Sequence, residues 1–234
     1  MVFAASQATR DELVARHALD PDQVALVPPG VSARFAPVSP AECAGLCKHH
    51  GLDAPFVLYR AGHDLRMDTS LLLHAFARLR KKRKDRVLLV CEGDLEADPA
   101  HAAFQSLVEE LRLGKVVRFI GEVPVEHEAR LVGAARVVAI PARADGAGAA
   151  ALEAMACGTP VISSKAGSLP EVVGGAGLVV PEADVEAWVR ALTSLQHDPT
   201  ARSVLRAQGL ERAKSFDWAT IAATQVRLYR EVLA

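Results

Sequence analysis

The chain has 234 residues, of which 50% are hydrophobic and 24% charged, a composition typical of an ordinary globular protein. Lys and Arg number 27 against 28 Asp and Glu, and a formal net charge of -1 gives no support to general nucleic-acid binding. The sequence has no apolar run of the roughly 18 residues that a spanning helix needs, and its N-terminal apolar run is too short for a signal peptide. We therefore expect a cytoplasmic protein.

The N-terminal segment differs in pattern from the rest of the chain. Residues 2–17 predict a strand followed by a helix, which either Ser6 or Thr9 caps. Thr9 and Glu12 have the spacing of a capping box. Residues 24–27 predict another strand, and the two prolines and the glycine that follow it form a stiff turn typical of a domain junction.

Short β-rich apolar runs then alternate with helical patterns. Several of these runs are continuously apolar, as expected for strands covered on both faces. The alternation predicts an α/β domain with a Rossmann-like, doubly wound parallel sheet. The predicted strands are 56–59, 87–91, 116–120, 137–140, 161–163 and 178–180, and the predicted helices lie near 68–80, 100–112, 125–134 and 148–156.

The last third of the chain is predicted to be helical. Asp198 and Pro199 start one helix, and Asp217 is the predicted N-cap of the last one. The last helix carries an apolar stripe, which consists of Trp218, Ile221, Ala222, Leu228, Tyr229 and Val232.

The four cysteines are Cys43, Cys47, Cys91 and Cys157. Cys43 and Cys47 lie one helical turn apart and close to two histidines, so a metal site is conceivable there. The spacing differs from the usual Cys-x2-Cys of zinc sites, however. Reduced and mostly buried thiols are the simpler interpretation, and we predict no metal.

The segment richest in chemical information is residues 145–162, DGAGAAALEAMACGTPVI. A loop of small residues follows a predicted strand and opens a helix, whose N-terminal N–H groups and positive dipole end suit a phosphate. Glu153, inside this helix, has a carboxylate that ribose hydroxyls could donate to. Many α/β proteins have glycine-rich strand–helix turns without a phosphate ligand, so both interpretations stay open on the chemistry alone.

The sequence resembles the group 1 family of retaining, nucleotide-sugar-dependent glycosyltransferases, which have the GT-B fold. The strongest match is residues 151–164, ALEAMACGTPVISS, and it continues through 167–173, GSLPEVV, and 177–181, GLVVP. Further matching pieces are 27–31, 35–37, 117–124, 216–218 and 228–233.

The resemblance implies the C-terminal, nucleotide-sugar-binding half of a GT-B fold, within residues 30–234. Residues 1–29 would be the last part of a preceding domain that binds the acceptor, and helix 217–233 would cross back onto that domain. The implied reaction is the transfer of a hexosyl group from a UDP-, GDP- or ADP-sugar with retention of configuration, without a metal or another cofactor. The implied partners are the nucleotide-sugar and an acceptor domain, or a second copy of the chain.

The resemblance also assigns roles to single residues. The family's Glu-x7-Glu motif corresponds to Asp145 and Glu153, which would contact the donor sugar and the ribose; we take these two as the catalytic candidates. The other residues expected to bind the nucleotide-sugar are Gly146, Gly148, Ala149, Ala150, Arg66, Gly121 and Val123.

The sequence departs from the family at the cations that grip the donor diphosphate. The family's Gly-Arg pair aligns with Ala61 and Gly62, and its Lys with Met67. Cations remain only at the displaced positions Arg60, His63 and Arg66. Since a charge-assisted hydrogen bond contributes roughly 1.5–3 kcal/mol, transfer activity could be very low.

Two functional hypotheses therefore remain. The first is a donor-binding domain that needs a separate acceptor domain. The second is a degenerate, non-catalytic module that acts in protein interaction. The basic run 78–86 is most simply a solvated helix end, and its alternative role is contact with anionic lipid.

Overall fold

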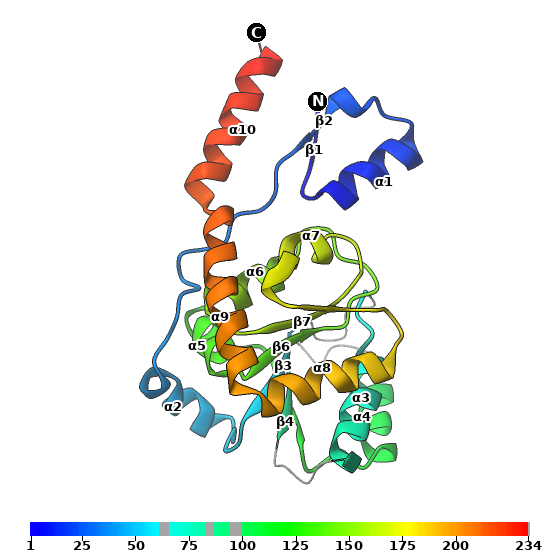
Figure 1. Ribbon diagram of the computed structural model, residues 1–234, viewed down its shortest axis with the longest axis vertical. Coiled ribbons are helices and arrows are strands. Elements are labelled where there is room, and N and C mark those ends of the chain that lie inside the picture. Colours follow the sequence, from blue (N-terminus) through cyan, green and yellow to red (C-terminus); the bar gives the residue numbers. More distant parts are fainter. Residues whose placement is uncertain (61–65, 83–86, 94–99, 234) are drawn as a thin grey trace.

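A computed structural model describes residues 1–60, 66–82, 87–93 and 100–233. Its centre is a six-stranded parallel sheet with the strand order β5-β4-β3-β6-β7-β8 (Figure 1). These strands are β3 (Phe56–Arg60), β4 (Leu88–Glu92), β5 (Val117–Phe119), β6 (Val137–Ile140), β7 (Val161–Ser164) and β8 (Leu178–Val180).

The central strands form because their residues are apolar on both faces. Every residue of β4 and β6 is buried, and so are the first four residues of β3. β3 pairs with β4 on one side and with β6 on the other, where Val57 is opposite Val137 and Leu58 opposite Val138. The predicted doubly wound parallel sheet is confirmed.

Nine helices of the described part accompany this sheet. They are α2 (Pro40–His49), α3 (Thr69–Lys82), α4 (Ala100–Glu110), α5 (Val125–Ala134), α6 (Ala149–Ala156), α7 (Leu169–Val173), α8 (Val185–His197), α9 (Pro199–Ala213) and α10 (Trp218–Leu233). α3 packs against α4 and α8, whereas α5 packs against α2 and α6, and α9 lies along α6. Strand order reverses between β3 and β6, so their following helices diverge and leave a crevice between their carboxyl ends.

Side-chain caps fix the starts of several helices. The carboxylates of Asp198 and Asp217 accept backbone hydrogen bonds from Ala201 (2.9 Å) and Thr220 (2.9 Å), which confirms both predicted caps. Ser39 begins α2 with a full capping box. α2 and α7 were not predicted from the sequence, because neither has a long apolar stripe.

The N-terminal segment forms a separate two-stranded parallel sheet. It consists of β1 (Val2–Ala4), α1 (Gln7–His17) and β2 (Val24–Leu26). Ser6 caps α1 by accepting a hydrogen bond from the backbone N–H of Thr9 at 3.0 Å. The capping box that Thr9 and Glu12 were expected to form is therefore wrong: α1 begins before Thr9, which lies within its first turn.

This N-terminal unit contacts the six-stranded domain at two places. The backbone N–H of Gln7 donates to the carboxylate of Glu171 in α7 at 2.8 Å, and the Thr9 hydroxyl donates to the carbonyl of Gly146 at 3.2 Å. It also contacts α10, where the rings of Phe3 and Tyr229 meet edge to face at 5.3 Å. Figure 1 shows α10 and the 1–29 unit side by side above the sheet. The division into 1–29 and 30–234 stays a prediction.

A glycine allows the close approach of two loops at the carboxyl edge of the sheet. Gly167 has a φ of +51°, and a Cβ at this position would collide with the carbonyl oxygen of Asp145. Next to it, the backbone N–H of Ser168 donates to that same carbonyl at 2.9 Å. The loop after β7 thereby holds the loop after β6.

We predict that Gly167→Ala destabilises the protein by more than about 2 kcal/mol, because it combines a left-handed backbone conformation with a backbone clash. Urea denaturation followed by circular dichroism measures the free energy of unfolding. Gly45→Ala is the matched control, since nothing lies within 4 Å of a Cβ there and alanine is favoured inside a helix by about 0.5–1 kcal/mol. Equal stability of the two variants would contradict the role of Gly167.

Candidate functional site

The candidate site lies where the strand order reverses, at the carboxyl edge of the sheet. β3 ends there at Arg60, β4 ends at Glu92, and α6 begins at Ala149. This edge is where ligands of open α/β sheets bind.

Arg60 is the centre of a buried ion cluster. Its Nη1 lies 2.7 Å from Oε2 of Glu153, its Nε 3.1 Å from Oε2 of Glu92, and its Nη2 3.3 Å from Oε1 of Glu128. Each nitrogen of the guanidinium thus faces a different carboxylate. The Arg60 side chain is only 12% exposed. Arg34 joins the cluster from outside, with Nη2 at 2.8 Å from Oε2 of Glu128.

Among the described residues, the cluster contains three carboxylates and two guanidinium groups, so this part of it has more negative than positive charge. Burial alone would lower the pKa of Arg60, but the charges of Glu92 and Glu153 outweigh it and the pKa is raised. Burial raises the pKa of Glu153, while the charge of Arg60 opposes this change. Arg60 therefore favours the ionised form of the glutamate.

Glu153 lines a cavity of about 190 Å³. The opposite wall comes from the chain that leads into α2 and from the start of α10, and includes Val31, Arg34, Phe35 and Trp218. Arg34 stacks over the ring of Phe35, with 4.9 Å between the guanidinium carbon and the ring centroid. A cavity of this volume is below the usual size of a drug-sized ligand site, and it suits one polar ring or head group.

Asp145 holds the glycine-rich loop before α6. Its Oδ1 accepts hydrogen bonds from the backbone N–H groups of Ala147 at 3.0 Å and Gly148 at 2.5 Å, and from the Ser168 hydroxyl at 2.7 Å. This oxygen thus fixes the loop. The predicted contact of Asp145 with a donor sugar is untested, and its other oxygen has no hydrogen-bond partner in the part of the chain that the structure describes.

The first turn of α6 presents backbone donors. Gly148 is the N-cap with a φ of +66°, and no side chain caps the helix. The N–H groups of Ala149 and Ala150 at this start have no partner within the helix. Gly146 and Ala149 are exposed, as the predicted approach of a phosphate requires.

The remaining predicted site residues lie at different distances from the cluster. Glu92 connects Val123 with it, because its Oε1 lies 3.5 Å from the Val123 N–H. Gly121 is next to this contact and accepts a hydrogen bond from the N–H of Gly93 at 3.0 Å. Arg66 is joined to the loop after β6, where its carbonyl accepts from the backbone N–H of Arg143 at 2.6 Å.

A cation that the sequence analysis missed lies near the predicted lysine position. Met67 forms an isolated antiparallel bridge with Ala142, which brings Arg143 close to it. The guanidinium of Arg143 donates to Oδ2 of Asp68 from Nε at 3.2 Å and from Nη2 at 2.9 Å. The aligned positions Ala61 and Gly62, and the displaced cation His63, lie outside the described residues.

Sequence reasoning also missed Arg34 and Glu128 as members of the cluster. Neither lies in a recognisable motif, and both reach Arg60 only through tertiary packing. Arg60 was noted only as a displaced cation, and Glu92 only as a polar residue at a strand end. No local signal in the sequence could have paired these residues.

Two observations on the described residues concern metal ions and membrane-spanning helices. Within ranges 1–60, 66–82, 87–93 and 100–233, no group of three or more His, Cys, Asp or Glu could hold a metal ion. The cysteines are free thiols, and burial raises the pKa of Cys91 and of Cys157 to about 12. None of the described helices is long and apolar enough to cross a membrane.

The basic run of residues 78–86 is only partly described, because residues 83–86 lie outside the described ranges. Arg78, at its start, makes an ion pair with Glu186 of α8 at 2.7 Å.

Comparison with known proteins identifies the family. Residues 50–212 match the family model described as "Glycosyl transferases group 1". The chain therefore belongs to the group 1 glycosyltransferases, and the resemblance inferred from its motifs is confirmed.

Individual relatives agree with this assignment. The chain is 31% identical over 233 residues to the O-antigen chain mannosyltransferase B of Escherichia coli. This alignment covers 98% of this chain and 60% of that protein. It is 33% identical over 249 residues to the D-inositol 3-phosphate glycosyltransferase of Kineococcus radiotolerans, with 99% and 57% coverage. The chain thus spans less than two thirds of the length of these relatives.

Solved structures show the same architecture. The sucrose-phosphate synthase of Thermosynechococcus elongatus superposes with a TM-score of 0.85 at 31% identity, over 99% of this chain and 58% of that one. Anabaena Alr3699/HepE in complex with UDP-glucose superposes with a TM-score of 0.88 at 20% identity, over 99% and 64%. The fold is the Rossmann-like fold of GT-B glycosyltransferases.

We predict that Arg60→Met destabilises the protein by about 3–5 kcal/mol at neutral pH, because it leaves three glutamates without their shared cation. Without the charge of Arg60, the pKa of Glu153 rises further above its ordinary value. The destabilisation therefore grows as the pH rises through this raised pKa. It shrinks as the pH falls through the raised pKa of Glu153, where this carboxylate becomes protonated.

Urea denaturation at pH 5 and pH 7.5 measures this dependence. Arg227→Met is the matched control, since Arg227 is 64% exposed and pairs with Glu231 on the surface of α10. Its loss should change the free energy of unfolding by less than about 0.5 kcal/mol at either pH. A pH-independent effect of Arg60→Met would contradict the electrostatic role of the cluster.

Proposed function

We propose that the chain is the donor-binding domain of a retaining glycosyltransferase that transfers a hexosyl group from a nucleotide-sugar. The observation that carries the proposal is the position of Glu153. Its carboxylate lines a cavity, lies within the first two turns of α6, and shares this edge of the sheet with the unpaired N–H groups of Ala149 and Ala150. A carboxylate next to free backbone donors suits a ligand that has both hydroxyl and phosphate groups.

The contacts of Glu153 support a ribose ligand. Arg60 holds Oε2, and among the described residues no hydrogen-bond partner exists for Oε1, which therefore remains available to a hydroxyl. Arg60 also favours the ionised carboxylate, which accepts hydrogen bonds only. The diphosphate would lie at the start of α6, and the donor sugar would lie toward Asp145.

Relatives support the class of substrate. One is a mannosyltransferase, another is a D-inositol 3-phosphate glycosyltransferase, and a structural neighbour was solved with UDP-glucose. In this proposal the chemistry needs no metal, and an acceptor-binding domain docks on the 1–29 unit and α10.

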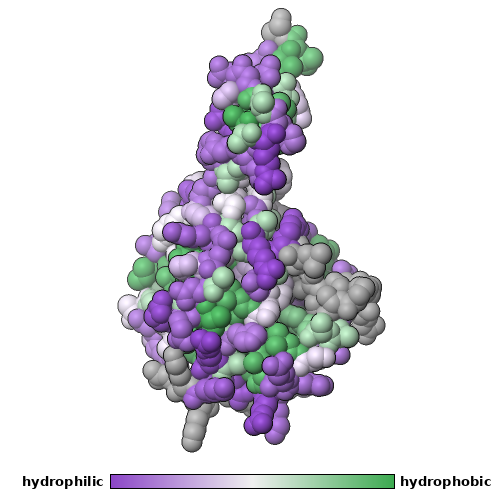
Figure 2. Space-filling view, turned by 90° about the vertical axis from the view of Figure 1, so that its right-hand side faces the viewer, coloured by the Kyte–Doolittle hydropathy of each residue, from purple (hydrophilic) through white to green (hydrophobic). Residues whose placement is uncertain are grey.

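A second candidate function is protein interaction without catalysis. The observation in its favour is the hydrophobic surface of α10, where Trp218, Val226, Tyr229 and Val232 are about half exposed. At the narrow upper end of the molecule, Figure 2 shows hydrophobic side chains scattered among hydrophilic ones. Both candidate functions use such a surface for docking, so only the binding of a nucleotide-sugar distinguishes donor binding from protein interaction.

We predict that Glu153→Gln weakens binding of the cognate nucleotide-sugar at least about tenfold, because the ribose loses a charge-assisted hydrogen bond. Calorimetry with UDP-, GDP- and ADP-sugars, repeated with EDTA, identifies the donor and measures the loss. Glu211→Gln is the matched control, since this glutamate is 74% exposed on α9 and pairs with Lys214 on the surface. Folded wild-type protein that binds none of these sugars would refute donor binding.

The variant that combines Gly62→Arg with Met67→Lys separates the two candidate functions. If the pocket persists and only its grip on the phosphates is weak, nucleotide affinity should rise at least tenfold, because each new cation adds a charge-assisted contact. Calorimetry with the same sugars measures the gain. An unchanged lack of binding would favour the interaction module.

A further inference from the structure

A cavity lies at the edge of the sheet opposite the candidate donor site. Its volume is about 480 Å³, against about 190 Å³ for the cavity beside Glu153. Its lining includes the residues that directly precede strands β3, β6 and β7, which are Pro55, Arg136 and Pro160. The cavity is therefore at the amino ends of the central strands.

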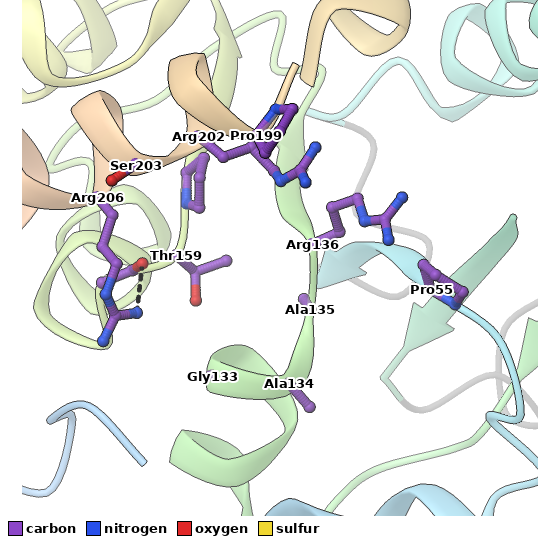
Figure 3. Close-up of a pocket in the computed structure, with 12 residues that line it drawn as sticks. Pro55, Gly133, Ala134, Ala135, Arg136, Thr159, Pro199, Arg202, Ser203 and Arg206 are labelled. Atoms are coloured by element: carbon purple, nitrogen blue, oxygen red, sulfur yellow. Dashed lines mark hydrogen bonds between the residues drawn. The ribbon is translucent and has the colours of Figure 1, made fainter. Parts of the chain in front are cut away.

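Three arginines line this cavity. Arg136 comes from the start of β6, and Arg202 and Arg206 project from the first turns of α9, which forms the other wall (Figure 3). The lining includes no Asp or Glu, and none of the three arginines has a carboxylate within 4.0 Å among the described residues. Positive charge gathers here without the acidic partners that accompany Arg60 at the opposite edge.

Arg136 and Arg202 also repel each other. Burial lowers the pKa of Arg136, and the charge of Arg202 lowers it further. Two guanidinium groups that face each other in a partly buried place destabilise the protein unless an anion lies between them. Figure 3 shows the guanidinium of Arg202 directed toward that of Arg136.

Existing hydrogen bonds use only part of the donors. Arg136 and Arg202 both donate from Nη1 to the carbonyl of Gln196, at 3.3 and 3.2 Å, and Arg206 donates from Nη1 to the carbonyl of Gly158 at 3.0 Å. One arginine is enough to satisfy the carbonyl of Gln196 near the end of α8, so this hydrogen bond does not explain why two arginines lie here. The Nε and Nη2 groups of all three have no hydrogen-bond partner in the described ranges.

Further donors surround the same place. Ser203, which carries a hydroxyl, lines the cavity next to Arg202, and so does Pro199 at the start of α9, whose N-terminus is capped by the carboxylate of Asp198. The buried Nε2 of Gln196, whose Oε1 accepts from Arg136 at 3.1 Å, has no hydrogen-bond partner among the described residues. The side chains that line the cavity are thus rich in donors and include no carboxylate.

We propose that this cavity is a second binding site, which takes a phosphate group of a small phosphorylated molecule. Guanidinium forks match phosphate oxygens in geometry and charge. The volume is within the usual range for small-molecule sites and exceeds that of a free phosphate ion. The site is independent of the donor site, because it shares no lining residue with the cavity beside Glu153.

Calorimetric titration of the full chain with inorganic phosphate, and with glycerol 2-phosphate as a phosphomonoester, tests the proposal at low ionic strength. We expect saturable binding that chloride at matched ionic strength does not reproduce. The double variant Arg136→Gln with Arg202→Gln should weaken this binding at least about tenfold. Stronger binding of the phosphomonoester than of free phosphate would show that the site takes the phosphate group of a small phosphorylated molecule rather than the free ion.

Three further variants keep the test decisive. Arg206→Gln loses a single hydrogen bond to Gly158, so it should fold and bind phosphate more weakly even if the double variant does not fold. Arg190→Gln removes an equal charge from a side chain that is 70% exposed on α8, and should leave phosphate binding unchanged. Glu153→Gln should also leave it unchanged, which separates this site from the donor site. Absence of saturable binding, or equal affinity in wild type and Arg206→Gln, would overturn the proposal.

Discussion

The buried guanidinium of Arg60 is the interaction on which the carboxyl edge of the sheet depends. It joins the end of β3 to the end of β4, to α5 and to the first turns of α6 through three carboxylates. Burying any one of these charges alone would cost several kcal/mol, so the arrangement is stable only when all of the elements are in place. The position of Glu153 is consequently set by the whole fold rather than by its own helix.

The loop before α6 is held in a different way, by hydrogen bonds rather than by ion pairs. Asp145 gathers two backbone N–H groups and the Ser168 hydroxyl on one oxygen, and Gly167 allows the neighbouring loop to come close enough for this. The two supports are separate. The cluster orients the carboxylate that is proposed to bind ribose, while Asp145 orients the backbone groups that are proposed to face the phosphates.

Sequence patterns were sufficient for the sheet and for the start of α6. Continuous apolar runs identified every strand of the six-stranded sheet, and the small-residue loop identified the helix that carries Glu153. The pairing of Arg60 with Glu153 was out of reach, because it crosses 93 positions of sequence and depends on strand order. Likewise, α7 has only five residues and shows no periodicity, and the cap of α1 was ambiguous because Ser6 and Thr9 are both good N-cap residues.

The near-neutral net charge of the chain conceals a separation of charge between the two edges of the sheet. Glu153 and its neighbours place an excess of carboxylates at the carboxyl edge, whereas Arg136, Arg202 and Arg206 place cations without carboxylates at the amino edge. A phosphate at the carboxyl edge must therefore rely on backbone donors at the start of α6 and on exposed cations such as Arg143, because Arg60 is already surrounded by carboxylates. At the amino edge no acidic side chain of the lining opposes an anion. Total charge bounds the class of ligand for a whole surface, but it does not decide which edge of one sheet attracts a phosphate.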